Sequence, residues 1–213
     1  DKASKKDKGS DHPQSAPGEL GSVKEEEKDW EKALEDHVKA LDDLQQLLYA
    51  HDRFALLLVF QAMDAAGKDS TIRRVLSGVN PAGFQVYSFK APSKEERDHD
   101  FLWRSARALP ERGRIGVFNR SYYEEVLVVR VHPSFLDGQQ LPDQSRGDDI
   151  WDRRLESIRD HERHLAYNGT AVVKFFLNVS QREQHARFRA RIDDPTKNWK
   201  FNSGDLKESA HWD

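Results

Sequence analysis

The pattern of apolar and polar positions divides the chain into alternating strand and helix segments. Residues 54–60 (FALLLVF) form a short continuous apolar run, which is typical of a parallel strand buried on both faces. A similar run at 170–177 (TAVVKFFL) predicts a further buried strand, and shorter stretches at 84–89 and 115–118 predict two more. We therefore expect a sheet of mostly parallel strands with helices between them.

The segments between these strands carry helical spacing or helix-start signals. From Trp30 onward, apolar residues recur every three or four positions and predict an amphipathic helix packed on the core, through Leu34, Val38, Leu41, Leu44 and Leu48. A second such pattern runs through Ile150, Leu155, Ile158 and Leu165 and ends near Asn168 and Gly169. Helix starts are predicted by two Ser-x-x-Glu pairs, Ser93 with Glu96 and Ser180 with Glu183.

The alternation of strands and helices predicts the fold class and the place of the ligand site. Parallel strands joined by helices require right-handed crossovers, which cover both faces of the sheet. Ligands of such α/β folds bind at the carboxyl ends of the strands. We expect one domain over residues 28–213. Residues 1–27 have almost no large apolar side chains, so their composition predicts a mobile arm.

Composition narrows the function classes. The chain of 213 residues is 37% hydrophobic and 33% charged and has no cysteine, which excludes disulfides, thiolate metal sites and a cysteine nucleophile. No apolar run is long enough for a membrane span, and the amino end is charged, so a cytoplasmic protein with no membrane partner is expected.

The distribution of charge indicates an anionic ligand. The net charge is −3, so nucleic acid is not the expected partner. Two basic clusters nevertheless stand out, one with the arginines between 104 and 120 and one with Arg187, Arg189, Arg191, Lys197 and Lys200. They suit an anion, although each arginine taken singly is more typical of a solvated helix face.

Residues 61–71 (QAMDAAGKDST) have the placement of a phosphate-binding loop, between the first strand and a helix. In such a loop, backbone N–H groups and the helix amino terminus face the phosphates, and the lysine neutralises their charge. The candidate phosphate-binding residues of the loop are Ala65, Ala66, Gly67, Lys68, Asp69 and Ser70. The alternative is a tight strand-to-helix turn in which the glycine and the lysine are structural.

The loop departs from the G-x-x-x-x-G-K-[ST] pattern in two places. Ala62 replaces the first glycine, and Asp69 replaces the Ser or Thr whose hydroxyl usually binds magnesium. The loop also contains Asp64, a carboxylate that would repel phosphate unless a metal ion bridged the two. We therefore expect Mg²⁺ at Asp64, with Mn²⁺ as an alternative.

Several long blocks resemble the family-2 polyphosphate kinases. They are MDAAGKDSTIRRVLSGVNPAGFQVYSFKAPS, DHDFLWR, LPERGRIGVFNRSYYEEVLVVRVHP and DDPTKNWKF. SFKAPS and FNRSYYEEVLV are similar to class III of that family, whose members phosphorylate nucleoside mono- and diphosphates. The resemblance implies a three-layer P-loop kinase fold, similar to thymidylate kinase, with a parallel sheet and a lid.

The resemblance also implies roles for individual residues. Asp64 and Lys68 match the loop residues that hold magnesium and the transferring phosphates. Asn119 and Arg120 match the Walker B position, where other classes carry Asp-Arg, and Glu124 matches an acidic residue near the nucleotide phosphates and the metal. Arg187 and Arg191 match a basic helix that leads into the lid. The lid itself is expected to be partial at 193–213, because family members continue beyond the position of Trp212.

The matched residues and the family resemblance together imply a reversible, magnesium-dependent reaction that transfers the terminal phosphoryl group of inorganic polyphosphate to ADP or AMP. We expect the polyphosphate along a basic channel, and Arg187 and Arg191 closing over the transferring group. The expected channel residues are Lys68, Arg73, Arg74, Lys90 and Arg120. Nucleotide binding is expected at Asn119, Arg120 and Glu124.

Two other functions fit the same residues. One is a nucleoside monophosphate kinase with ATP as donor, which shares the sheet, the loop and an arginine-bearing lid. The other is a non-catalytic polyphosphate-binding module. Family members associate, so a homo-oligomer is expected, and the helix after Trp30 is a candidate interface. Trp103, Tyr122 and Tyr123 could stack on a base, although their spacing is more typical of core residues.

Overall fold

The computed structural model describes residues 17–196, 198–200, 204 and 208–212. Four strands form one parallel sheet in the order β2-β3-β1-β4, as the alternating pattern predicts. Their bounds are Ala55–Ala62 for β1, Phe84–Ser88 for β2, Ile115–Asn119 for β3 and Thr170–Leu177 for β4. The central strand β1 therefore delivers the loop that follows it to the middle of the sheet's carboxyl edge.

Helices connect the strands. The α-helices are α1 (Pro17–His51), α2 (Lys68–Leu76), α3 (Lys94–Arg97), α4 (Trp103–Ala106), α5 (Val128–Val131), α6 (Ile150–Tyr167) and α7 (Gln181–Asp193). Short 3-10 helices are η1 (Pro81–Gly83), η2 (Tyr122–Glu125), η3 (Pro133–Gln139), η4 (Asp143–Ser145), η5 (Asn198–Lys200) and η6 (Ser209–His211).

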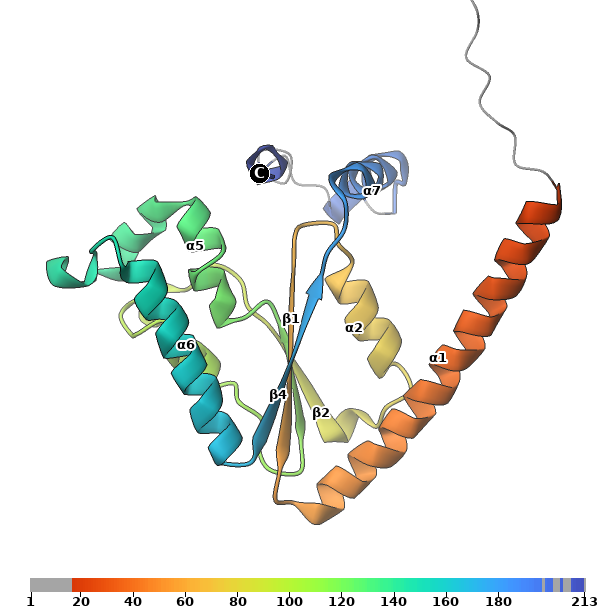
Figure 1. Cartoon of the computed structure of the whole chain (residues 1–213), viewed down its shortest axis with the longest axis horizontal. Coiled ribbons are helices and arrows are strands. Elements are labelled where there is room, and N and C mark those ends of the chain that lie inside the picture. The colour runs from red at the N-terminus through yellow and green to blue at the C-terminus, as the bar shows by residue number, and fades with distance from the viewer. Residues whose placement is uncertain (1–16, 197, 201–203, 205–207, 213) are drawn as a thin grey trace, which may run out of the picture.

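The helices cover the sheet as two outer layers (Figure 1). Helices α1 and α2 lie on one face, and α5 and α6 lie on the other, while α7 lies beyond the carboxyl ends of the strands. Neighbouring strand residues alternate between the two layers. Phe60, Ile115 and Val117 pack on the side of α2, and Leu57, Val59 and Phe118 pack on the side of α6. Each fully buried side chain of this size contributes about 1.5–3 kcal/mol.

The prediction that 170–177 is a buried strand is correct for its bounds and wrong for its burial. Val173, Phe175 and Phe176 of β4 are 40%, 41% and 60% exposed. The reason is topological: among the described strands, β4 pairs with β1 alone and stands at the edge of the sheet. An apolar run indicates a strand, but it does not say whether another element covers it.

Helix α1 begins earlier than the apolar pattern predicts. It starts at Pro17 and includes residues 17–27 of the predicted arm, while residues 1–16 lie outside the described residues. Residues 17–27 include four glutamates and one lysine, residue types that propagate a helix well once tertiary packing has nucleated it.

One apolar position of α1 faces away from the core. Leu44 is 61% exposed, and its neighbour Gln45 is 3% exposed, because the buried stripe advances from Leu41 by four residues and then by three to Leu48. Leu44, Leu47 and Trp30 are large exposed side chains on this helix. Self-association through α1 stays a prediction.

The helix predicted to start at Ser93 is short. The capping box with Glu96 is present, but α3 ends at Arg97 and a separate helix α4 starts at Trp103. Between them, the carboxylate of Asp100 accepts a hydrogen bond from the backbone N–H of Leu102 at 2.9 Å, an arrangement that competes with helix continuation.

No helix in the described part of the chain combines the length and the apolar character that a membrane crossing needs.

Candidate functional site

The loop between β1 and α2 has the backbone conformation of an anion cradle. Gly67 at the start of α2 has a φ of 96°, and Ala65 has a φ of 61°, so both occupy the left-handed region. The N–H of Ala66 donates to the carbonyl of Met63 at 3.2 Å and tightens the turn. Within the described part of the chain, no side chain caps the amino terminus of α2. Its N–H groups are therefore available to an anion.

Lys68 lies at the base of this loop among charged groups. Its Nζ donates to the carbonyl oxygen of Ala62 at 2.9 Å. Burial lowers the pKa of Lys68, as does the charge of Arg120, whereas the carboxylates of Asp64, Glu124 and Asp69 oppose the shift. The ammonium group thus sits in a partly desolvated place where a phosphate would strengthen its charged form.

Arg120 lies between the two predicted metal ligands. Its Nη2 donates to Asp64 Oδ1 at 3.1 Å, and its Nη1 donates to Glu124 Oε2 at 3.3 Å. Its backbone is left-handed, with a φ of 64°, directly after β3 ends, and its N–H donates to the carbonyl of Phe60 at 3.0 Å. The sheet thereby fixes a strained turn that brings the guanidinium between carboxylates from two segments.

Glu124 is held from its other side by a residue that the sequence analysis did not single out. Gln61, which is 7% exposed, donates from Nε2 to Glu124 Oε1 at 2.9 Å. The Oε1 atom of Gln61 accepts a hydrogen bond from Ser121 Oγ at 3.3 Å. A polar residue at the end of an otherwise apolar strand was the available signal for Gln61.

A hydrogen-bonded cluster anchors η2, which carries Glu124. The hydroxyls of Tyr122 and Tyr123 both donate to Glu162 Oε1 at 3.0 Å, and Lys174 Nζ donates to Glu162 Oε2 at 2.6 Å. Burial and the Glu162 carboxylate raise the pKa of Tyr122. Tyr122 is 1% exposed, so the core interpretation of this aromatic holds.

Asp69 and Asn119, which replace the usual hydroxyl and aspartate, contact each other. The Nδ2 atom of Asn119 donates to Asp69 Oδ1 at 2.5 Å and lies 3.4 Å from Ser88 Oγ. The first turn of α2 and the end of β3 are therefore joined directly.

Helix α7 supplies two of the predicted arginines, and Arg187 contacts the loop itself. Its Nη1 donates to the carbonyl oxygens of Ala65 at 3.2 Å and Ala66 at 2.8 Å, while its Nε donates to Glu183 at 2.7 Å. Gln184 of the same helix, also not singled out from the sequence, donates to the carbonyl of Asp64 at 3.0 Å. The lid predicted at 193–213 lies partly outside the described residues.

Two predicted channel residues lie elsewhere. Arg74 extends toward α1, where its Nη2 lies 3.3 Å from the carboxylate of Glu31, and Arg73 is exposed without lining the cleft. Both follow the loop by one to two helical turns, and the rotation of α2 directs them away from the strand ends. Neither arginine lines this cleft, and a contact of Arg73 or Arg74 with polyphosphate stays a prediction.

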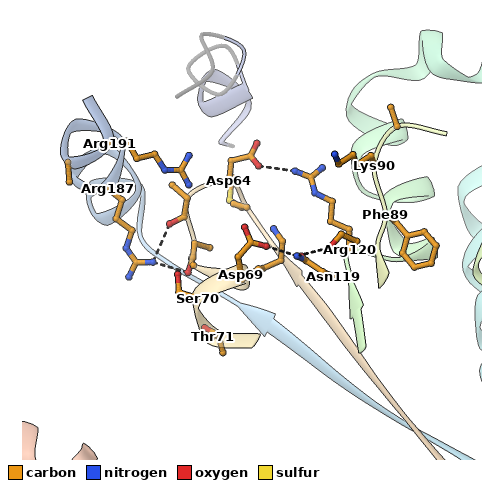
Figure 2. Close-up of a pocket in the computed structure, with 18 residues that line it drawn as sticks. Asp64, Asp69, Ser70, Thr71, Phe89, Lys90, Asn119, Arg120, Arg187 and Arg191 are labelled. Atoms are coloured by element: carbon orange, nitrogen blue, oxygen red, sulfur yellow. Dashed lines mark hydrogen bonds and ion pairs between the residues drawn. The ribbon is translucent and has the colours of Figure 1, made fainter. Parts of the chain in front are cut away.

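The remaining predicted residues surround one cleft of about 1020 Å³ at the carboxyl edge of the sheet. Figure 2 shows Arg187 and Arg191 on one side and Lys90, Asn119 and Arg120 on the other. The cleft residues predicted from the sequence are Asp64, Ala65, Ala66, Gly67, Lys68, Asp69, Ser70, Lys90, Asn119, Arg120, Arg187 and Arg191. Glu124 lies behind Arg120, outside this set.

A second cavity of about 250 Å³ adjoins the cleft. Met63, Asp64 and Arg120 line both spaces. The second cavity has an apolar wall, made by Leu127, Val128, Val131 and Phe176, and it includes Glu124 and Gln184. The Asp64–Arg120 pair therefore stands where a polar space and a more apolar space meet.

Comparison of the sequence with family models gives a match that includes this phosphate loop and covers nearly the whole chain. The family model for polyphosphate kinase 2 matches residues 24–213. The chain belongs to the polyphosphate kinase 2 family. This membership agrees with the resemblance of the sequence blocks, and it makes the fold that of a P-loop kinase.

Relatives within the polyphosphate kinase 2 family carry specific names. The chain is 58% identical, over 198 residues, to an ADP-polyphosphate phosphotransferase of Rhodopseudomonas palustris, covering 92% of this chain and 68% of the relative. It is 46% identical, over 175 residues, to an AMP/ADP-polyphosphate phosphotransferase of Meiothermus ruber, covering 82% of this chain and 61% of that one. A crystal structure of polyphosphate kinase 2 from Arthrobacter aurescens TC1 matches with a TM-score of 0.77 and 42% identity, over 84% of this chain and 61% of that chain. The chain thus spans about two thirds of the length of these relatives.

Proposed function

We propose that this chain carries the phosphoryl-transfer site of a polyphosphate-dependent nucleotide kinase, which moves the terminal phosphoryl group of inorganic polyphosphate to ADP or AMP. The observation that carries the proposal is the meeting of the two spaces at Asp64 and Arg120. A reaction between a long polyanion and a nucleotide needs two adjoining binding spaces of different character, with cations where they join.

The larger cleft suits the polyphosphate. Its floor is the uncapped amino terminus of α2, and Lys68, Lys90 and Arg120 line it. Arginine and backbone N–H groups bind phosphate oxygens with charge-assisted hydrogen bonds. The smaller cavity suits the nucleoside of the acceptor, because its apolar wall can cover a base and its polar groups can orient it.

Arg120 is placed to serve the transferring group. Its guanidinium is shared by Asp64 and Glu124. A phosphoryl group between the two spaces would lie beside this cation, which neutralises charge in the transition state. The closing of α7 and its arginines over the cleft would exclude water and so limit hydrolysis.

We propose that a divalent metal ion, Mg²⁺ or alternatively Mn²⁺, accompanies the phosphates. No group of three or more His, Cys, Asp or Glu among the described residues could hold a metal alone. The donor set nevertheless fits magnesium, which uses one or two carboxylates together with phosphate oxygens and waters. Asp64 and Glu124 are the carboxylates proposed for it, and the ion would supply charge neutralisation and phosphate alignment.

The test is formation of ATP from ADP, and separately of ADP and ATP from AMP, with polyphosphate and Mg²⁺ and no nucleoside triphosphate. The variant Lys68→Met should lose at least about 100-fold in rate, since one preorganised cation is removed from the site. Lys32→Met, on the exposed surface of α1, is the matched control and should retain the rate.

Each alternative function has its own outcome when the assay is repeated with ATP in place of polyphosphate and when polyphosphate binding is measured in parallel. Phosphorylation of AMP with ATP as the sole effective donor would replace the proposal by a nucleoside monophosphate kinase. Binding of polyphosphate with no transfer to either acceptor would replace it by a binding module.

A further inference from the structure

The contact between Asp69 and Asn119 joins two positions that P-loop enzymes use for the metal ion. In P-loop NTPases, a Ser or Thr hydroxyl after the lysine and an aspartate at the end of a neighbouring strand hold Mg²⁺. In this chain the first position is Asp69, in the first turn of α2, and the second is Asn119, the last residue of β3. The carboxylate has therefore changed sides, from the strand to the helix.

The geometry of the pair supports an exchange of roles. Asn119 donates from Nδ2 to Asp69 Oδ1 at 2.5 Å, a contact that Figure 2 shows inside the cleft. Among the described residues, Asn119 is the hydrogen-bond partner of the Asp69 carboxylate, which leaves its second oxygen for a ligand.

We propose that Asp69 is a carboxylate that faces a divalent metal ion at this corner of the cleft, in addition to the ion proposed at Asp64 and Glu124, and that Asn119 is the positioning residue that holds it. The proposal rests on the proposed function. An aspartate at position 119 would face the Asp69 carboxylate and repel it, whereas the asparagine amide donates to it. The identity of one residue thus explains the identity of the other.

A structural role for Asp69 makes a different prediction. An acidic residue in the first turn stabilises a helix by interacting with its dipole. In that case, loss of the carboxylate would lower the stability slightly and leave metal binding unchanged, and the residue at position 119 would not matter.

The experiment moves the carboxylate between the two positions. Four variants are compared with the unchanged chain: Asp69→Asn, Asp69→Ser, and each of these combined with Asn119→Asp. Asp69→Ser with Asn119→Asp recreates the common P-loop arrangement. Asp137→Asn, which removes a carboxylate that is 73% exposed, is the matched control. Binding of Mn²⁺ in the presence of tripolyphosphate is measured by electron paramagnetic resonance, and phosphoryl transfer is measured in parallel.

Both single variants should weaken Mn²⁺ binding by about 10- to 100-fold, the usual effect of losing a group that supports a metal. Both double variants should recover most of this loss, because each restores one carboxylate at the corner. Circular dichroism checks that each variant is folded. Because the carboxylate is removed in two ways, by Asp69→Asn and by Asp69→Ser, the test can still be made if one of these variants does not fold.

Two results would overturn the proposal: single variants that bind Mn²⁺ like the control, or double variants that bind no better than the singles. Failure of the proposed function is a separate outcome. The unchanged chain would then bind Mn²⁺ and tripolyphosphate without transferring a phosphoryl group, and the binding measurements would still decide the role of Asp69.

Discussion

The Nη1 atom of Arg187 lies 2.8 Å from the carbonyl oxygen of Ala66, so helix α7 holds the phosphate loop through its backbone. The second acceptor of the same atom is the carbonyl of Ala65. From the sequence we expect Arg187 to close over the transferring group. In the structure, its guanidinium faces loop carbonyls, which favours a supporting role for the loop.

We expect Arg187→Met to speed hydrogen exchange in the loop at residues 62–71 and to lower transfer by about 10- to 100-fold, because preorganisation of the loop is lost. Arg189→Met, which is exposed on the same helix, is the control. Hydrogen exchange measured by mass spectrometry separates two roles. Unchanged exchange with lost activity would return Arg187 to direct stabilisation of charge.

Gly67→Ala should destabilise the protein by about 1–3 kcal/mol, because a side chain at positive φ is strained. The φ of Gly67 is 96°, and an added Cβ would lie 3.3 Å from Arg187 Nη1. Gly138→Ala is the matched control, since its added Cβ would make ordinary contacts from 3.5 Å outward. Urea unfolding measures both free energies, and equal values for the two variants would contradict the argument.

Glu125→Gln should cost about 3–5 kcal/mol, because it leaves a buried guanidinium without its counter-charge. Arg154 Nη1 donates to Glu125 Oε2 at 2.9 Å, and both side chains are 6% exposed. Burial lowers the pKa of Arg154, and the Glu125 charge opposes that shift. Asp149→Asn breaks the exposed pair with Arg153 and should cost less than about 1 kcal/mol. Similar losses in the free energy of unfolding for Glu125→Gln and Asp149→Asn would show that the buried ion pair contributes no more to stability than the exposed one.

His161 should make the protein less stable as the pH falls. Burial lowers the pKa of His161 below its ordinary value of 6.5, helped by His164 and opposed by Glu162 and Asp100. Above pH 6.5, both the folded and the unfolded states hold a neutral ring, so no stability is lost. Below it, the unfolded state binds the proton first, and the free energy of unfolding decreases.

His161→Gln should therefore flatten the pH dependence of the melting temperature between about pH 7 and pH 5. His37→Gln, on the exposed side of α1, should keep the slope of the unchanged chain. A slope that survives in His161→Gln would assign the effect to another group.

The two cavities can be tested independently. Val131→Trp fills part of the smaller cavity and should raise the KM for ADP by about tenfold with little change in the KM for polyphosphate, since only the acceptor loses contacts.

Lys90→Met should raise the KM for polyphosphate by about tenfold, because one phosphate contact is lost from the larger cleft. If the effects are reversed, the assignment of substrates to the two cavities is wrong.

Much of the site could be predicted from the sequence, because its residues follow strand ends. The loop after β1 and the pair Asn119 and Arg120 after β3 meet at one edge, as parallel strands require. Gln61 and Gln184 could not be predicted in the same way. Their role depends on which backbone or side-chain group lies opposite them: Gln61 precedes the G-x-x-x-x-G-K pattern near the end of β1, and Gln184 lies on α7.

Local sequence determined the strands, most helix boundaries and the phosphate loop, since these features depend on periodicity, capping and glycine within a few residues. Only the tertiary structure decided that Arg74 pairs with α1, that β4 stands exposed at the sheet edge, and that Asn119 meets Asp69 from 50 positions away. The physical reason is that a side chain's partners are set by the rotation of its helix and the order of the strands. The rotation of each helix and the order of the strands are fixed when the layers pack together, and the residues next to a position in the sequence do not determine either of them.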